Sequence, residues 1–401
     1  MSHLNRTMTW VIGICVLLVF AIVFRARSVS FWLYTAVLVV LIARLVVGLT
    51  LRRLRITHSM ANDHVFPGER VRFTLKVRNG SPLPAPWVWV EDQVPANLHK
   101  GPVFSHVATL QPGQERTYSY EVQTTERGLY RVGRVDVSVG DWFGLRELTG
   151  IVDEPRWLTV YPRIVSIPPL KIPARLPVGP RRDPLSPFQD VDPIGLRPYR
   201  SGDPLRLIAW KATAHRDELT VKEVPLVRER ITYFFLNFSR ADWDPGRRFE
   251  LIERVISVAA TLIWWEPDPR HSLGLVAYGR ITRSVPEGIG RDVEDPRVLR
   301  VAAHYGPAQR RALLETLAGL EPGDGPPFID MLADEARHLP WGATIVLLVP
   351  TNTERLVALA AQLQTRGHPV VILTFEPRRT MGRSGITVHE VQFDMQEVRW
   401  A

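Results

Sequence analysis

Residues 231–241 read Ile-Thr-Tyr-Phe-Phe-Leu-Asn-Phe-Ser-Arg-Ala, and the apolar part of this stretch is typical of a strand buried on both faces. A segment with helical spacing, Phe249 to Trp264, follows it and stops before Pro267. Three further buried strands are expected at Ser272–Tyr278, Thr344–Val349 and Val370–Phe375, and three helices at Gln309–Leu320, Ile329–Leu339 and Thr353–Arg366. This alternation predicts a doubly wound α/β domain over residues 225–401.

Upstream, residues 56–162 are rich in short strands. Val71 to Val77 alternates apolar and polar residues, which is typical of a strand with one buried face. The same pattern recurs between turn residues at Trp87–Val90, Thr117–Val122 and Arg134–Val139. We expect a β-sandwich-like domain here. Trp87 and Trp89 are two residues apart and so face one way; they could form a platform for a sugar or peptide, and we favour a core role.

The N-terminus contains two apolar runs, Met8 to Phe24 and Val29 to Leu51, the second interrupted only by Arg44. Each approaches the roughly 20 residues that cross a bilayer as a helix. Because only four residues separate them, residues 1–55 are predicted to form a transmembrane hairpin with both ends on one side. A signal peptide is the alternative, but no clear A-x-A cleavage site is present.

Flanking charge favours a cytoplasmic location for the two ends of this hairpin. Four arginines flank the ends and two lie in the connecting turn: Arg6, Arg52, Arg53 and Arg55 against Arg25 and Arg27. Positive residues are enriched on the cytoplasmic side of membrane spans. We therefore expect a two-span protein of the inner membrane whose soluble domains face the cytoplasm.

Composition excludes several classes of protein. The 401 residues are 45% apolar and 23% charged, enough for two or three packed domains. The net charge of +9 arises mostly in residues 1–55, which contain arginines and no acidic residue, so the remainder is nearly neutral and nucleic acid is not an expected partner. The single cysteine, Cys15, excludes an intrachain disulfide and a cysteine metal cluster.

The densest polar motif follows a Pro-rich stretch, Pro162 to Pro187, and residues 163–224 are expected to form a linker and a signature segment. Within it lie Arg197, Tyr199, Arg200, Gly202, Asp203, Arg206, Trp210, Lys222 and Glu223. An Asp between arginines can accept bidentate hydrogen bonds that fix a loop. Clustered Arg, Tyr and Trp also anchor protein interfaces. Both interpretations, a braced loop and a docking surface, remain open.

The signature segment resembles that of the domain of unknown function 58 family. The matching residues are Arg197-x-Tyr199-x-x-Gly202-Asp203-x-x-Arg206-x-Ile208-x-Trp210-x-x-x-Ala214 and Leu219-x-Val221-Lys222-Glu223, with Arg127-Gly128-x-Tyr130-x-x-Gly133 and Asp141-x-Phe143-Gly144-Leu145 upstream. The resemblance implies a membrane-anchored protein with a von Willebrand factor A-like C-terminal domain. It also implies partnership with a MoxR-type AAA+ ATPase and with transglutaminase-like membrane proteins, and it brings no defined reaction.

Ligands of doubly wound sheets sit beyond the carboxyl ends of the strands. A metal-binding von Willebrand factor A domain has Asp-x-Ser-x-Ser after its first strand, which gives a hard cation a carboxylate and two hydroxyls. This chain has Asn237, Ser239 and Ala241 at those positions. We therefore expect a degenerate site with no metal and no cofactor, unless Asp242 or Asp244 supplies the carboxylate.

Three functions are compatible with these observations. The first is a non-enzymatic membrane-anchored scaffold whose signature segment binds protein partners. The second is an envelope adhesion or ligand-binding protein with its soluble part outside, using Trp87 and Trp89 or a surviving cation site. The third is a membrane-bound hydrolase using carboxylates such as Asp203 and Asp217, for which the sequence has neither a G-x-S-x-G nor an H-E-x-x-H motif.

Overall fold

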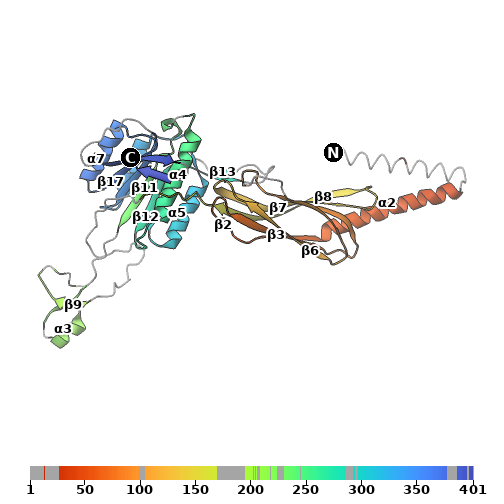
Figure 1. The fold of residues 1–401 in the computed structure, drawn as a ribbon. Coiled ribbons are helices and arrows are strands. Elements are labelled where there is room, and N and C mark those ends of the chain that lie inside the picture. The colour runs from red at the N-terminus through yellow and green to blue at the C-terminus, as the bar shows by residue number, and fades with distance from the viewer. Residues whose placement is uncertain are drawn as a thin grey trace. The chain divides into compact units, whose positions relative to one another are not determined.

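The structure, a computed structural model, describes residue 13 and residues 27–98, 104–168, 195–201, 203, 205, 208–216, 218–223, 230–243, 245–284, 292–293, 297–376, 386–394 and 397–400. The chain divides into two compact units, which are described one at a time (Figure 1). Unit 1 comprises Met1–Arg163, Ile281–Glu294 and Leu317–Leu320, and unit 2 comprises Ile164–Arg280, Asp295–Thr316 and Glu321–Ala401.

Unit 1 begins, in its described part, with one long helix. Helix α2 (Arg27–Arg53) is continuous, and its Phe31–Arg53 portion is long and apolar enough to cross a membrane. No other helix of the described residues meets that criterion. The second predicted span is therefore present as a helix. The first predicted span, Met8 to Phe24, lies outside the described residues except for Gly13, so the hairpin itself stays a prediction.

The C-terminal half of α2 is part of the core of the strand-rich domain. Ala43, Val46, Val47 and Thr50 are buried, at the spacing of one helix face. The helix contacts strands β4 (Ala85–Gln93), β7 (Gly128–Gly140) and β8 (Glu147–Val160). The strand-rich domain thus takes its core residues from the end of the helix as well as from the strands.

Two sheets share this core, and we call the domain they form the sandwich. One is antiparallel, with strand order β1 (Leu54–Met60), β3 (Arg70–Asn79), β6 (Glu115–Gln123). The other contains the order β5 (Ser105–Leu110), β4, β7, β8, β2 (His64–Val65); among these five strands the β2–β8 pair is parallel and the other pairs are antiparallel. Leu75 of β3 and Val88 of β4 meet Val47 in one cluster, so alternate residues of both sheets form the core.

The predicted core role of Trp87 and Trp89 is wrong. The two indoles share a face, as expected, but in β4 the core positions are the alternate ones, Val88 and Val90. Both tryptophans are half-buried on the other face, where the Trp89 indole nitrogen donates to Ser105 Oγ over 2.7 Å. Period-two alternation allows only one set of side chains to face the core, and the valines occupy it.

The Arg127-Gly128-x-Tyr130-x-x-Gly133 motif is structural within unit 1. Tyr130 is fully buried, and its hydroxyl donates to the Glu126 carbonyl over 2.9 Å. Gly133 has φ +97°, and a Cβ there would lie 2.2 Å from the Glu154 carbonyl oxygen, so only glycine fits. The register of β7 against β8 shifts at this glycine. The motif therefore shapes the sandwich.

Unit 2 contains the predicted α/β sheet. Its strand order is β14 (Arg297–His304), β12 (Ser272–Ser284), β11 (Ile231–Leu236), β16 (Thr344–Val349), β17 (Val370–Thr374), β18 (Thr387–Asp394), β19 (Glu397–Trp400). The strands from β12 to β18 are mutually parallel, and the outer strands β14 and β19 are antiparallel to their neighbours. All four predicted buried strands are present in this sheet.

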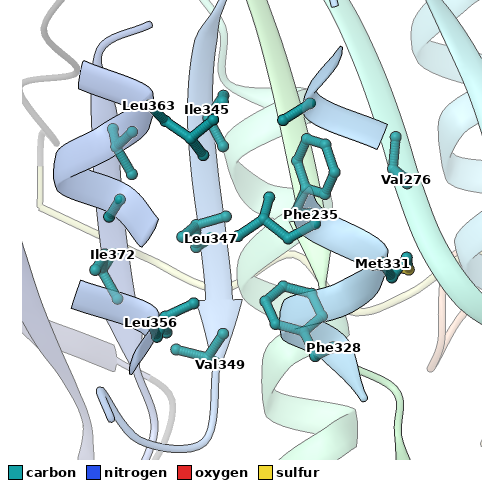
Figure 2. Packing of buried hydrophobic residues seen from close by; sticks show 14 residues of the cluster. Phe235, Val276, Phe328, Met331, Ile345, Leu347, Val349, Leu356, Leu363 and Ile372 are labelled. Carbon is teal, nitrogen blue, oxygen red and sulfur yellow. The ribbon is translucent and has the colours of Figure 1, made fainter. Parts of the chain in front are cut away.

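Helices α6 (Phe328–Glu335) and α7 (Glu354–Thr365) cover one face of this sheet. Figure 2 shows Phe235, Phe328 and Leu347 lying together in the cluster between these helices and the strands. Helix α4 (Arg248–Trp264) contacts β16 and contributes nothing to that cluster, so it covers the other face. Helix α5 (Pro307–Gly319) matches its prediction, while α6 ends at Glu335, before the expected Leu339, and continues as a 3-10 turn.

Candidate functional site

The signature segment folds as a small hairpin with a helix. Strands β9 (Gly195–Pro198) and β10 (Thr220–Glu223) pair antiparallel, and α3 (Trp210–Arg216) lies between them in sequence. Val221 and Ile208 form a bridge and are buried, and the Ala209 amide donates to the Thr220 carbonyl over 2.9 Å. The Thr220 amide in turn donates to Thr213 Oγ1 of α3 over 3.1 Å. These bonds attach the helix to the hairpin.

A bidentate ion pair fixes the turn that follows β9. The Arg197 guanidinium donates from its two terminal nitrogens to the two carboxylate oxygens of Asp203, each over 2.7 Å. The Arg200 amide donates to the same carboxylate over 2.8 Å. The hydrogen bonds from Arg197 and then from Arg200 lower the pKa of Asp203 to about 2. The structure thus contains the bidentate Arg–Asp pair that the sequence allowed.

Apolar side chains are exposed on this braced segment. Trp210, the first residue of α3, is 67% exposed, and Leu205 is exposed to a similar degree. Leu196 and Leu219 are also exposed. Sequence reasoning named Trp210 and Leu219 in the family signature but not Leu196 and Leu205, because an isolated leucine in a loop or strand has no pattern that distinguishes it. Exposed apolar side chains gathered on an ordered segment are typical of interaction surfaces.

The remaining signature residues differ in exposure, and some of them lie outside the described residues. Tyr199 is half-buried, and its amide donates to the Leu219 carbonyl over 2.8 Å. Lys222 is exposed and pairs with Leu196 in the hairpin register. Glu223 is described only as the last residue of β10. Gly202 and Arg206 lie outside the described residues, so their predicted roles stay predictions.

The loop after β11 is closed by its own side chains. Asn237 is buried; its Oδ1 accepts from the Ser239 amide over 3.1 Å, and its Nδ2 donates to Asp242 Oδ2 over 2.9 Å. The Trp243 indole donates to the Asn237 carbonyl over 2.9 Å. The Asp242 carboxylate, which was the conditional replacement for a missing ligand, is thus the partner of the Asn237 amide.

Among the described residues, no three His, Cys, Asp or Glu side chains lie close enough together to hold a metal ion. Of the predicted degenerate site, Asn237 and Ser239 are buried in the loop, the side chain of Ala241 is not described, and Asp244 lies outside the described residues. Next to the loop, Arg240 pairs with Asp324 over 3.2 Å. Within the loop, the side chains of Asn237 and Asp242 are thus hydrogen-bonded to each other.

Comparison with known proteins agrees with the signature. The sequence model of the family described as "Protein of unknown function DUF58" matches residues 195–321. The chain is 25% identical over 270 residues to the uncharacterized protein YeaD of Bacillus subtilis (strain 168), with 64% of each chain covered. The chain thus spans slightly less than two thirds of the length of that relative.

Two solved structures match parts of this chain with low TM-scores. The CARDB domain of the PF1109 protein from Pyrococcus furiosus is matched by 25% of this chain at 18% identity, over 90% of that domain, with a TM-score of 0.18. The sporulation control protein Spo0M from Bacillus subtilis is matched by 27% at 15% identity, over 49% of its chain, with the same TM-score. Scores this low do not establish a common fold. The family match covers the signature segment, in agreement with the resemblance that its residues predict.

Proposed function

We propose that this protein is a non-enzymatic, membrane-anchored scaffold that binds a protein partner through its signature hairpin. The observation that carries the proposal is the exposure of Trp210 and Leu205 on a segment whose shape is fixed by the Arg197–Asp203 pair. Tryptophan and arginine are the residues that most often dominate binding energy at interfaces. A preformed hairpin also loses little conformational entropy on binding.

Asp203 is poorly suited to the rival hydrolase role. Its two carboxylate oxygens accept from Arg197, and its pKa of about 2 leaves the group ionised at neutral pH. A general acid needs a proton near the working pH, and a general base needs an accessible lone pair and a pKa closer to neutrality. These properties favour a structural role for Asp203 in shaping the hairpin.

The C-terminal sheet supports, as a proposal, a von Willebrand factor A-like fold with a degenerate metal site. Numbered from β11 as the first strand, the order β14-β12-β11-β16-β17-β18 is the doubly wound order 3-2-1-4-5-6. The position where that fold would bind a cation holds the Asn237–Asp242 hydrogen bond. An amide cannot replace the carboxylate charge of such a site. We infer that the domain recognises protein without a bridging metal.

The partner we propose is a MoxR-type AAA+ ATPase, with transglutaminase-like membrane proteins as further components. This assignment rests on the family resemblance of the signature. The proposed location is the inner membrane, with two spans and the soluble units in the cytoplasm, in agreement with the arginines that flank the spans. Reporter fusions at Ala401 test the topology: activity of a periplasmic reporter there would contradict it and favour an externally facing ligand-binding protein.

Affinity capture tests the partner. Full-length protein is captured from gently solubilised membranes with ATP present, and the recovered proteins are identified by mass spectrometry. We expect wild type to recover a MoxR-type ATPase and Trp210→Ala to lose about tenfold or more of it, as for an interface hot spot. Trp265→Ala is the matched control, since Trp265 is 65% exposed, close to the 67% of Trp210. Equal capture by wild type and Trp210→Ala would refute the docking role.

A further inference from the structure

The loop between β7 and β8, residues 141–146, presents a second exposed apolar group. Trp142 is 58% exposed and Phe143 is 67% exposed, and Leu145 beside them is exposed too. The strands on either side are well paired, from Gly140 opposite Glu147 inward. Three large apolar side chains within four residues of one tight loop are unusual on a water-facing surface.

The Asp141 carboxylate organises this loop from within. It is buried and accepts hydrogen bonds from three backbone amides, those of Phe143 (2.6 Å), Leu145 (3.2 Å) and Arg146 (2.6 Å). Gly144 has φ +68°, which lets the chain reverse there. The Asp141 amide donates to the Arg146 carbonyl over 3.3 Å. With these amides bonded internally, the loop can leave water at a lower cost than an ordinary surface loop.

Contacts along α2 place this loop near the point where the helix leaves the sandwich. A Cβ on Gly150 would lie 3.3 Å from the Leu51 side chain, so Leu51 sits over the β7–β8 pair at Gly150 and Val137. Val47, one turn earlier, shares a cluster with Val139. A further turn of about 5.4 Å brings Ala43 to the level where β7 ends and the loop begins.

The length of the free part of α2 points to the same level for the membrane surface. From Val29, where the apolar run begins, to Ile42 the helix extends about 21 Å, and its buried residues begin at Ala43. A hydrocarbon core is about 30 Å thick. Figure 1 shows this N-terminal part of α2 projecting beyond the sandwich. If α2 spans the bilayer, the last part of the apolar thickness must be matched by the end of the sandwich itself.

We propose that Trp142, Phe143 and Leu145 enter the bilayer at the level of the lipid headgroups and upper acyl chains, as a second contact of the sandwich with lipid. Indole and phenyl side chains prefer this interfacial region. The helix fixes the distance of the sandwich from the membrane, and the loop fixes its rotation about the helix axis. The inference rests on the proposed membrane anchoring through α2.

Site-specific quenching tests the inference on the full-length chain in lipid nanodiscs. In a Cys15→Ser background, single cysteines are introduced as Phe143→Cys in the loop, Leu41→Cys on the exposed face of α2 and Ala96→Cys at the opposite end of the sandwich. Each carries a small fluorophore, which is quenched by nitroxide-labelled lipids from the membrane and by iodide from water. Trp142→Cys and Leu145→Cys serve if the first loop variant does not fold.

We expect the labels at Phe143 and Leu41 to lose fluorescence with nitroxide lipids and to be protected from iodide, and the label at Ala96 to behave oppositely. A Phe143 label that is quenched by iodide alone would overturn the proposal, because the loop would then lie in water. A Phe143 label that is quenched by neither reagent would overturn it in favour of a protein-covered loop. A Leu41 label without lipid quenching would refute the anchoring itself, and the inference with it.

Discussion

Two aspartates each accept hydrogen bonds from several groups: Asp92 in the interior of the sandwich and Asp203 near the surface of the signature hairpin. Asp92 is fully buried; its Oδ2 lies 2.9 Å from His58 Nε2 and accepts a hydrogen bond from the Tyr120 hydroxyl. Asp203 is only partly covered, and its oxygens accept from Arg197 and from the Arg200 amide. The first connects strands distant in sequence, whereas the second closes one turn.

Burial decides what each carboxylate does. Burial, together with the negative charge of Asp92, raises the pKa of Tyr120, so the phenol stays protonated and donates. Asp92 Oδ1 and His58 Nδ1 have no hydrogen-bond partner in the part of the chain that the structure describes. A buried network of this kind is costly to disrupt, while an ion pair next to water is not. The sandwich network therefore governs stability, and the hairpin pair governs local shape.

The largest expected effect is that of Asp92→Ala. The substitution leaves the buried His58 and the partly buried Tyr120 without their acceptor, so the free energy of unfolding of the sandwich should fall by about 3–5 kcal/mol. Denaturant titration followed by hydrogen exchange of β7 amides measures it. Asp153→Ala, which removes a surface pair with Arg131, is the control and should cost less than about 1 kcal/mol. If the two variants lose the same free energy of unfolding, the buried network is no more important for stability than the surface pair.

A combined replacement sharpens the same comparison. Changing His58→Leu, Asp92→Leu and Tyr120→Phe together removes every polar member of the network. Buried ionic networks can be exchanged for apolar residues of similar size at little net cost. We therefore expect the triple variant to unfold at a denaturant concentration above that of Asp92→Ala. A triple variant less stable than the single one would show that the network stabilises the folded sandwich beyond satisfying the hydrogen bonds of its own buried polar groups.

An intermediate effect is expected for Asp141→Ala. Three amides would lose their acceptor, and opening of the loop should become easier by about 1–3 kcal/mol. Hydrogen exchange at Phe143, Leu145 and Arg146 reports it. The neighbouring exposed Glu147→Ala is the control and should leave these rates unchanged. Unchanged exchange in Asp141→Ala would mean that packing, not the carboxylate, orders the loop.

A smaller effect is expected for Asp203→Asn. The side chain keeps its size and loses its charge, so the Arg197 fork and the Arg200 amide lose part of their acceptor. The melting temperature should not change, because the pair is at the surface. Exchange at the Arg200 amide should accelerate. A clear drop in melting temperature would make Asp203 a global stabiliser like Asp92.

The smallest expected effect is the response of Asp203 to pH. Because the folded pKa of about 2 is below the ordinary 3.8, the pair favours the ordered hairpin above about pH 4 and is lost as the pH falls through about 2. Carboxyl ¹³C shifts of Asp-labelled protein, assigned by comparison with Asp203→Asn, should show no titration of this group between pH 8 and pH 4. A midpoint near 3.8 would show that the fork is open in solution.

The sequence predicted the elements of the molecule better than their contacts. Runs such as Thr344–Val349 are apolar throughout and flanked by breaks, and they are the strands of the sheet in unit 2. Strand β14 was missed, because Arg297–His304 alternates weakly between charged and apolar residues and lies on the outer side of the sheet. Likewise, the sequence showed that Asp203 could pair with an arginine, because six residues separate it from Arg197.

Other contacts leave no trace in the sequence. The buried stripe of Ala43, Val46 and Val47 on α2 cannot be recognised there, because the exposed side of the same helix is also apolar. His58 and Asp92 are 34 residues apart and belong to different sheets, so only the packing of the two sheets brings them together. Without a local spacing to read, no sequence pattern identifies such a network.

The burial of α2 in the sandwich determines where the chain can be cut. A truncated protein that begins at Leu54 would lack Val46, Val47 and Thr50, and its remaining core residues, Val88 and Val137 among them, would be left uncovered. A truncated protein that begins near Leu41 would keep the core but would expose Leu41, Ile42 and Leu45 to water. A water-soluble version of this protein therefore requires polar substitutions on the outer face of α2 as well as removal of its first turns.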